Sequence, residues 1–143
     1  MNISFYFETK IKLEKRLFLK KFLEEINKLE GNKINSLSFI FCSDLFLLNI
    51  NRRFLNHDNF TDIITFNLNT NKSEKAAGEI YISVDRVKEN AIKYKTSIEN
   101  ELHRVIFHGV LHLCGYKDKA SADKKEMTRL EDESLNKFFV SLK

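Results

Sequence analysis

Proline and tryptophan are absent from this sequence, and glycine is rare. With no proline in 143 residues, the ends of helices and strands must be set by Asn, Asp, Ser and Gly, which favour turns and helix caps. Only four glycines occur, and two of them, Gly109 and Gly115, lie close together. A glycine inside a helix costs about 1 kcal/mol relative to alanine. A helix that keeps Gly109 therefore needs close approach of substrate or of packed backbone at that point.

Cysteine is also scarce, because the sequence has only Cys42 and Cys114 and no C-x-x-C pair. This usage argues against a disulfide framework and fits a reducing compartment. Cys114 follows His112 by two positions, so it points to a different side of a helix than the histidine does. We expect both cysteines to be small buried apolar groups rather than metal ligands.

Long apolar runs are missing as well. None approaches the roughly 18 residues of a membrane-spanning helix, and the first residues lack the basic segment and long apolar stretch of a secretory signal. We therefore expect a cytoplasmic protein with no membrane partner. The formal net charge of +4 is a mild surplus, compatible with a phosphate-bearing partner without demanding one.

Apolar residues are nevertheless numerous enough for a core, at 43% of the chain. At this length we expect a single domain, residues 1–143. Alternation of apolar and polar residues predicts strands at 2–8 and 37–41, and three- and four-residue spacings predict a helix at 12–29. A further helix is predicted at 44–54, with Ser43 and Asp44 as its cap.

The second half predicts a hairpin and three helices. The strands of the hairpin are residues 61–66 and 78–83, joined by the polar residues 67–75. The first helix is predicted at 83–94. The second follows the capping-box spacing of Thr96–Glu99 and carries the histidines, and the third begins after Ser121, its predicted cap. Strands joined by helices imply right-handed crossovers and parallel pairing. We therefore predict an α+β fold, a small mixed four-stranded sheet with helices packed on it and a central metal-binding helix.

His108 and His112 stand four positions apart, so on a helix both rings project from one face about one turn apart. Imidazoles at this spacing can share one metal ion. Gly115 permits the left-handed conformation that ends a helix, and Asp118 follows it by three residues. A catalytic zinc needs three protein ligands and an open position for water. His108, His112 and Asp118 are therefore the candidate ligands of one zinc ion per chain.

Such an ion activates water for hydrolysis, and peptide and phosphodiester bonds are the competing substrates. The spacing matches the metzincin zinc helix with Asp118 in place of its last histidine. Those enzymes use a glutamate directly after the first histidine as general base, whereas Gly109 cannot exchange a proton. Phosphodiester cleavage depends more on charge neutralisation. Candidate phosphate contacts are Arg52, Arg53, Arg86, Lys88, Lys93, Lys95, Arg104, Lys117 and Lys119.

The segment His108-Gly109-x-Leu111-His112-Leu113-x-Gly115-Tyr116 resembles the signature of the YbeY family, the endoribonucleases and ribosomal RNA maturation factors of bacteria. Further matches lie at residues 61–66, 78–83 and 101–102, and at Met127. The resemblance implies a zinc-dependent endoribonuclease specific for single-stranded RNA. It also implies a role in maturation of the 3′ end of 16S rRNA and in ribosome quality control, with the small ribosomal subunit as partner.

The resemblance carries the metal ligands directly to His108 and His112. The family has Tyr-Asp-His where this sequence has Tyr116-Lys117-Asp118, so the third ligand falls on Asp118 as a substitution. The functional arginine of the family falls on Leu55. Arg52 or Arg53, in the preceding turn, is the candidate to replace it, and no other catalytic side chain is assigned.

Two other functions remain open. One is a non-catalytic RNA-binding or ribosome-assembly protein whose metal holds the helix end, and the other is a metallopeptidase. An open coordination position favours catalysis, and the sequence offers three ligands with no clear fourth. We expect His57 to face solvent, His103 to be structural or exposed, Glu101 to lie at the surface and Met127 to lie in the core.

Overall fold

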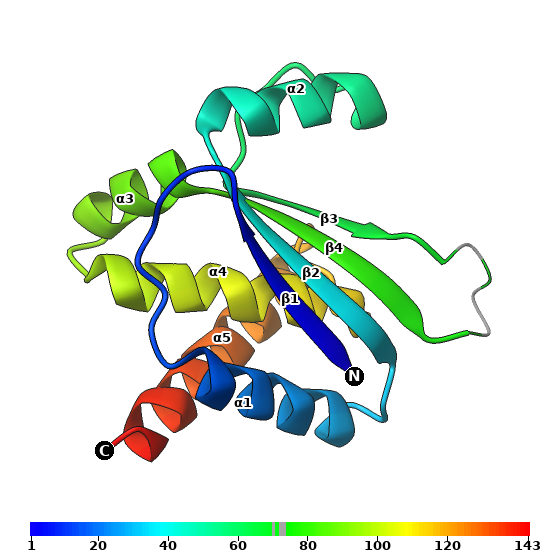
Figure 1. Ribbon diagram of the computed structural model, residues 1–143, viewed down its shortest axis with the longest axis vertical. Helices are drawn as coiled ribbons and strands as arrows, with labels where there is room; N and C mark the ends of the chain where they lie inside the picture. The colour runs from blue at the N-terminus through cyan, green and yellow to red at the C-terminus, as the bar shows by residue number, and fades with distance from the viewer. Residues whose placement is uncertain (70, 72–73) are drawn as a thin grey trace.

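The computed structural model describes residues 1–69, 71 and 74–143. Within these residues it has four strands and five helices (Figure 1), which confirms the predicted α+β fold class. The hairpin tip predicted at 67–75 includes residues 70, 72 and 73, which lie outside the described residues. In chain order the elements are β1 (Asn2–Phe7), α1 (Arg16–Leu29), β2 (Ile34–Cys42), α2 (Asp44–Leu55), β3 (Ile63–Asn67), β4 (Ala76–Ser83), α3 (Val84–Lys93), α4 (Ile98–Leu113) and α5 (Ser121–Ser141).

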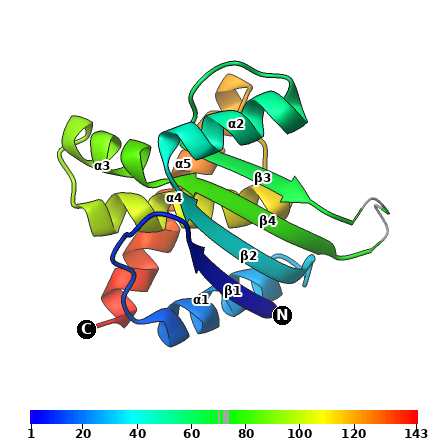
Figure 2. The ribbon, with the colours of Figure 1, turned by 45° about the horizontal axis from the view of Figure 1, so that its top comes forward.

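The strands form a mixed sheet in the order β1-β2-β4-β3. β1 pairs with β2 and β2 with β4 in parallel, while β3 and β4 are antiparallel, as the hairpin prediction required. Figures 1 and 2 show α1, α4 and α5 on one face of the sheet and α2 on the other. The sheet is therefore covered on both faces near β3 and β4.

Successive residues of β3 pack into two different cores because side chains alternate across a strand. Ile63 contacts the main core, which includes Val110 of α4 and Phe138 of α5. Ile64 belongs to a smaller core under α2, together with Leu47. Burial on both faces explains why this strand reads as an apolar run rather than as a strict alternation.

α4 lies very close to the sheet at Gly109. A Cβ atom added there would lie 3.0 Å from side-chain atoms of Ile63 and of Ile80, tighter than ordinary packing. The close approach predicted at this glycine is therefore confirmed, but the approaching atoms belong to side chains of the sheet and not to substrate or backbone. The same contact brings the histidine-bearing face of α4 beside β3.

Two predicted helix caps are wrong by one residue. The cap of α4 is Ser97, whose hydroxyl accepts a hydrogen bond from the backbone N–H of Asn100, so Thr96 does not form the predicted capping box. The cap position of α5 is Ala120, and Ser121 is the first helical residue. At α4, Thr96 and Ser97 offer equivalent hydroxyls, and the backbone path decides which of them is used. At α5, the cap residue is an alanine and no side chain caps the helix.

His103 is structural rather than exposed, with 2% of its surface accessible. Its ring stacks on Phe138 at a centroid distance of 4.8 Å, and its Nδ1 lies 2.7 Å from the Glu99 carbonyl oxygen. Nε2 is buried with no hydrogen-bond partner among the described residues. Burial lowers the pKa of His103, against the smaller raising effects of the backbone hydrogen bond and charge of Glu99.

This depressed pKa makes stability depend on pH. The unfolded chain binds a proton near pH 6.5 while the folded protein resists it, so His103 stabilises the fold above that pH and the stability is lost as pH falls through the lower folded pKa. The free energy of unfolding can be measured with urea at pH 7.5 and at pH 5.0. It should fall less between these two pH values for His103→Phe than for the wild type. The matched control is His57→Gln, which changes an exposed histidine and should keep the wild-type loss. Equal losses in His103→Phe and the wild type would contradict this account.

Candidate functional site

The predicted site residues lie at the C-terminal end of α4 and in the connection that follows it. His108 and His112 lie one turn apart on the same face, with ring centroids 6.4 Å apart. Asp118 lies in the connection to α5, and its Oδ2 is 3.2 Å from His108 Nε2. Gly115, with φ of +110°, turns the chain back toward the histidines. All three predicted ligands line one cavity of about 650 Å³.

The His108 ring is held between two carboxylates. Its Nδ1 lies 2.7 Å from Oε2 of Glu131, which comes from α5 and is 8% exposed, and its Nε2 faces Asp118. Burial lowers the pKa of His108, but the hydrogen bond and charge of Glu131, and the charges of Asp118 and Asp62, outweigh it and raise the pKa overall. An ionised carboxylate only accepts hydrogen bonds, so the Nδ1–H group donates to Glu131.

His112 is held more loosely. Its Nδ1 lies 3.3 Å from the hydroxyl oxygen of Thr65 on β3. Burial lowers the pKa of His112. The charge of Asp118 raises this pKa, whereas the charges of His108 and Lys119 lower it further. The neutral imidazole, which is the form that binds metals, is therefore favoured at this position.

The donor atoms fit a metal ion in chemistry and only partly in placement. Two donors of a tetrahedral zinc, each ~2.0–2.1 Å from the ion, lie roughly 3.3 Å apart, and the Nε2–Oδ2 distance of His108 and Asp118 is 3.2 Å. Two lone pairs facing each other at this distance repel unless a proton or a cation lies between them. Among the described residues, however, no group of three or more His, Cys, Asp or Glu side chains is placed to hold an ion. The structure therefore assembles His108 with Asp118 and leaves His112 one turn away.

Sequence reasoning missed the acidic lining of this cavity. Glu101, predicted at the surface, is 4% exposed and lines the cavity with Asp62 and Glu131. Burial raises the pKa of Glu101 to about 7 despite the opposing charge of Arg104, and burial also raises the pKa of Asp62. The missed signal was the helical spacing of Glu101 and His108, which are seven residues and about two turns apart.

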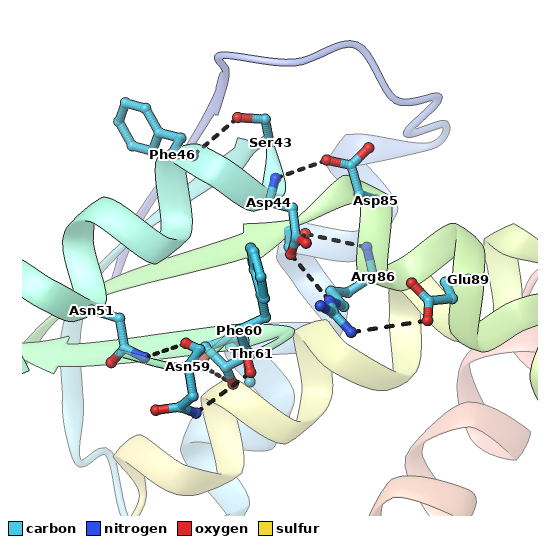
Figure 3. Close-up of polar contacts among 12 residues, drawn as sticks. Ser43, Asp44, Phe46, Asn51, Asn59, Phe60, Thr61, Asp85, Arg86 and Glu89 are labelled. Atoms are coloured by element: carbon cyan, nitrogen blue, oxygen red, sulfur yellow. Dashed lines mark hydrogen bonds and ion pairs between the residues drawn. The ribbon is translucent and has the colours of Figure 1, made fainter. Parts of the chain in front are cut away.

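The loop that carries Asp62 into the cavity is anchored from two sides (Figure 3). The buried Asn51 of α2 donates its side-chain N–H to the carbonyl oxygen of Asn59 at 2.8 Å. On the other side, the guanidinium of Arg86 lies over the ring of Phe60, 5.0 Å from its centroid, and its Nε is 3.1 Å from Asp44. Arg86 is therefore engaged in holding the loop.

The arginines proposed to replace the family arginine lie elsewhere. Arg52 pairs with Asp58, and the guanidinium of Arg53 lies 5.9 Å from the ring centroid of Phe54. Neither is among the described residues that line the cavity. Leu55, at the end of α2, is 39% exposed.

Lysines approach the predicted ligands more closely than these arginines do. Lys124 lines the main cavity, and Lys117 and Lys119 line a smaller hollow that also includes His112 and Asp118. Lys124 was not among the phosphate contacts predicted from the sequence. Arg104 also lines the main cavity but is paired with Glu131 and Asp132, whereas the lysines border the hollows that contain His112.

The described helices include none that combines the length and the apolar character needed to cross a membrane. Met127 is 2% exposed, as predicted for a core residue, and His57 is exposed. Cys42 and Cys114 are both buried as free thiols, as predicted. Burial raises the pKa of Cys114 to about 11, so its thiolate is disfavoured as a metal ligand.

Comparison with known proteins agrees with the fold and the motif. Residues 3–139 match the model of the family described as endoribonuclease YbeY. The chain is 47% identical over 129 residues to a protein of Cytophaga hutchinsonii named endoribonuclease YbeY, covering 90% of each protein. It is 41% identical over 138 residues to a protein of the same name from Flavobacterium psychrophilum, covering 96% of this chain and 97% of that protein.

A solved structure has the same fold. The solution structure of a Thermotoga maritima protein superposes with a TM-score of 0.62 at 24% identity, covering 99% of this chain and 91% of the other. At that identity the likeness concerns the fold alone. The sequence matches extend over nearly the whole chain and include the histidine-bearing helix. This chain therefore belongs to the endoribonuclease YbeY family.

Proposed function

We propose that this protein is a metal-dependent endoribonuclease that cleaves single-stranded RNA, with residues 1–143 forming one catalytic domain. The observation that carries the proposal is the meeting of His108 Nε2 and Asp118 Oδ2 at 3.2 Å inside an acidic cavity. Two electron-pair donors at this distance are suited to share a cation. Membership of the endoribonuclease YbeY family identifies the chemistry as cleavage of RNA.

The proposed metal ligands are His108, His112 and Asp118, and the proposed ion is zinc. His112 completes the set if its ring turns from Thr65 toward the other two donors. When bound, the ion supplies a Lewis acid that activates water and offsets phosphate charge. Asp118 contributes a negative charge where the family has a neutral imidazole, and oxygen ligands also suit harder ions such as manganese.

The cavity supports a catalytic role over a purely structural one. A structural zinc is enclosed by four protein ligands, whereas these three donors line an open cavity of about 650 Å³. A single RNA strand can bring one phosphodiester into such a space, with Lys117, Lys119 and Lys124 beside it to pair with neighbouring phosphates. Arg52 and Arg53 remain candidates for contacts further along the strand.

The acidic lining determines how RNA and metal depend on each other. Asp62, Glu101 and Glu131 lie in the cavity with the proposed ligands, and Arg104 is paired with Glu131. Without a cation this lining repels phosphate. We infer that RNA binding requires the metal. We further propose that the biological substrate is the 3′ end of 16S rRNA in the small ribosomal subunit. The protein would then act in the cytoplasm, in rRNA maturation and ribosome quality control.

Substitution of the proposed ligands tests the metal site. The wild type should contain about one zinc per chain, while His108→Ala and Asp118→Ala should lose it, because two donors hold zinc far more weakly than three. Asp118→His should retain the zinc. Metal analysis should be paired with cleavage of a single-stranded RNA oligonucleotide, with and without chelator. His57→Ala is the control and should keep both metal and activity.

Full zinc content in both alanine variants would refute this ligand set. Faster cleavage of a peptide library than of RNA would restore the metallopeptidase alternative. Bound zinc without RNA cleavage would favour the non-catalytic RNA-binding alternative.

Lys124→Ala tests the proposed phosphate contact. Each phosphate contact releases counterions, so the affinity for RNA falls as salt rises. Loss of one contact should make the negative slope of log affinity against log salt less steep by about 0.7 for a single strand. The binding of a fluorescent RNA oligonucleotide to the zinc-loaded protein, measured across a salt series, gives this slope. The control Lys21→Ala makes the same charge change on an exposed position of α1, outside the cavity lining. An unchanged slope in Lys124→Ala would exclude the contact.

A further inference from the structure

His108 contacts two carboxylates, and only Asp118 belongs to the proposed metal site. The other, Glu131, is 23 residues away in sequence and lies on α5. It is 8% exposed, so its ionised form must be satisfied by protein groups. Both of its oxygens have partners: Oε2 accepts from His108 Nδ1 at 2.7 Å, and Oε1 accepts from Arg104 at 3.0 Å.

Arg104 holds this carboxylate through a fork. It lies one turn before His108 on α4, and while one terminal nitrogen binds Glu131, the other lies 2.7 Å from Oδ1 of Asp132. A planar guanidinium fixes the direction of both hydrogen bonds. Glu131 is thus held on one side by Arg104 and offers its remaining oxygen to the imidazole. The side chain of Asp132 is 59% exposed, so solvent can replace that arm of the fork.

The geometry points to a positioning role. We propose that Glu131, held by Arg104, is the positioning residue that keeps the His108 ring with its Nδ1–H group engaged and its Nε2 lone pair directed at the metal position. Carboxylates that accept from the far nitrogen of a metal-binding histidine fix its tautomer and ring orientation. This inference rests on the proposed metal site and adds residues outside the ligand set.

Glu131→Gln is the informative change because it keeps the shape of the side chain and removes its charge. Its zinc affinity, measured by competition with a chromophoric chelator, should be about 10- to 100-fold weaker than that of the wild type. The absorption spectrum of the cobalt-loaded variant should also change, because the His108 ring is no longer held in one orientation. Both readouts are independent of RNA cleavage.

Asp132→Asn is the matched control. It removes the same charge from the adjacent position of α5 and also loses a bond to Arg104, but Asp132 does not contact His108 among the described contacts. Exposed ion pairs contribute little, so its zinc affinity should change by less than about fivefold. If Glu131→Gln does not fold, Arg104→Lys gives a second test. This change keeps the positive charge but removes the planar fork of the guanidinium. The zinc affinity of Arg104→Lys should therefore lie between the affinity expected for Glu131→Gln and that of Asp132→Asn.

The outcomes distinguish failure of the positioning role of Glu131 from failure of the proposed metal site. Wild-type zinc affinity in Glu131→Gln, or equal losses in Glu131→Gln and Asp132→Asn, would overturn the positioning role while leaving the metal site intact. Unweakened zinc binding by a folded Arg104→Lys would overturn the part assigned to Arg104. A wild-type protein that binds no zinc in the same assay would overturn the proposed metal site itself.

Discussion

The close packing of α4 on β3 and β4 is the constraint on which the site depends. Gly109 leaves room for the close approach of helix and sheet, since a Cβ there would lie 3.0 Å from side-chain atoms of Ile63 and Ile80. Because these strand residues are held in the main core, the helix cannot shift without opening that core. The face of α4 that bears His108 and His112 is thereby fixed against β3, where Thr65 meets His112.

A cavity with this many carboxylates is costly to bury without compensation. Transfer of an ionised carboxylate to the protein interior costs several kcal/mol unless it is paired. Arg104 compensates Glu131, and the imidazole of His108 compensates both Glu131 and Asp118. Glu101 has Arg104 at 3.9 Å, and its pKa is raised to about 7. The remaining acidity gives a divalent cation a favourable position, which is consistent with a metal-dependent endoribonuclease.

The resemblance to the family signature implies two departures, at Asp118 and at Leu55, and the structure places these two residues differently. Asp118 stands where the resemblance implies a histidine, and its Oδ2 lies 3.2 Å from His108 Nε2. Leu55 stands where the resemblance implies an arginine. The nearby Arg52 and Arg53 lie outside the cavity lining, in contact with Asp58 and Phe54 respectively. The lysines that follow Gly115 lie nearer to the predicted ligands than these arginines do.

Local patterns were enough to predict much of this protein. Hydrophobic patterns, strand-forming residue types and cap residues together predicted each described helix and strand, and the spacing of His108, His112 and Asp118 predicted three side chains that line one cavity. These features depend on neighbours within a few turns of chain. The helix caps at Ser97 and Ala120 were each missed by one residue. Thr96 and Ser97 offer equivalent hydroxyls side by side, whereas α5 begins without a side-chain cap.

Only the tertiary structure decided the surroundings of the histidines. Glu131 reaches His108 because α5 packs against α4, and Asp62 enters the cavity because α2 and Arg86 anchor its loop. Glu101 is buried although its residue type favours the surface, because it lies on the face of α4 that meets Asp62 and Glu131 from other parts of the chain. Sequence spacing specifies which side chains share one element, whereas contacts between elements distant in sequence arise only when the core closes.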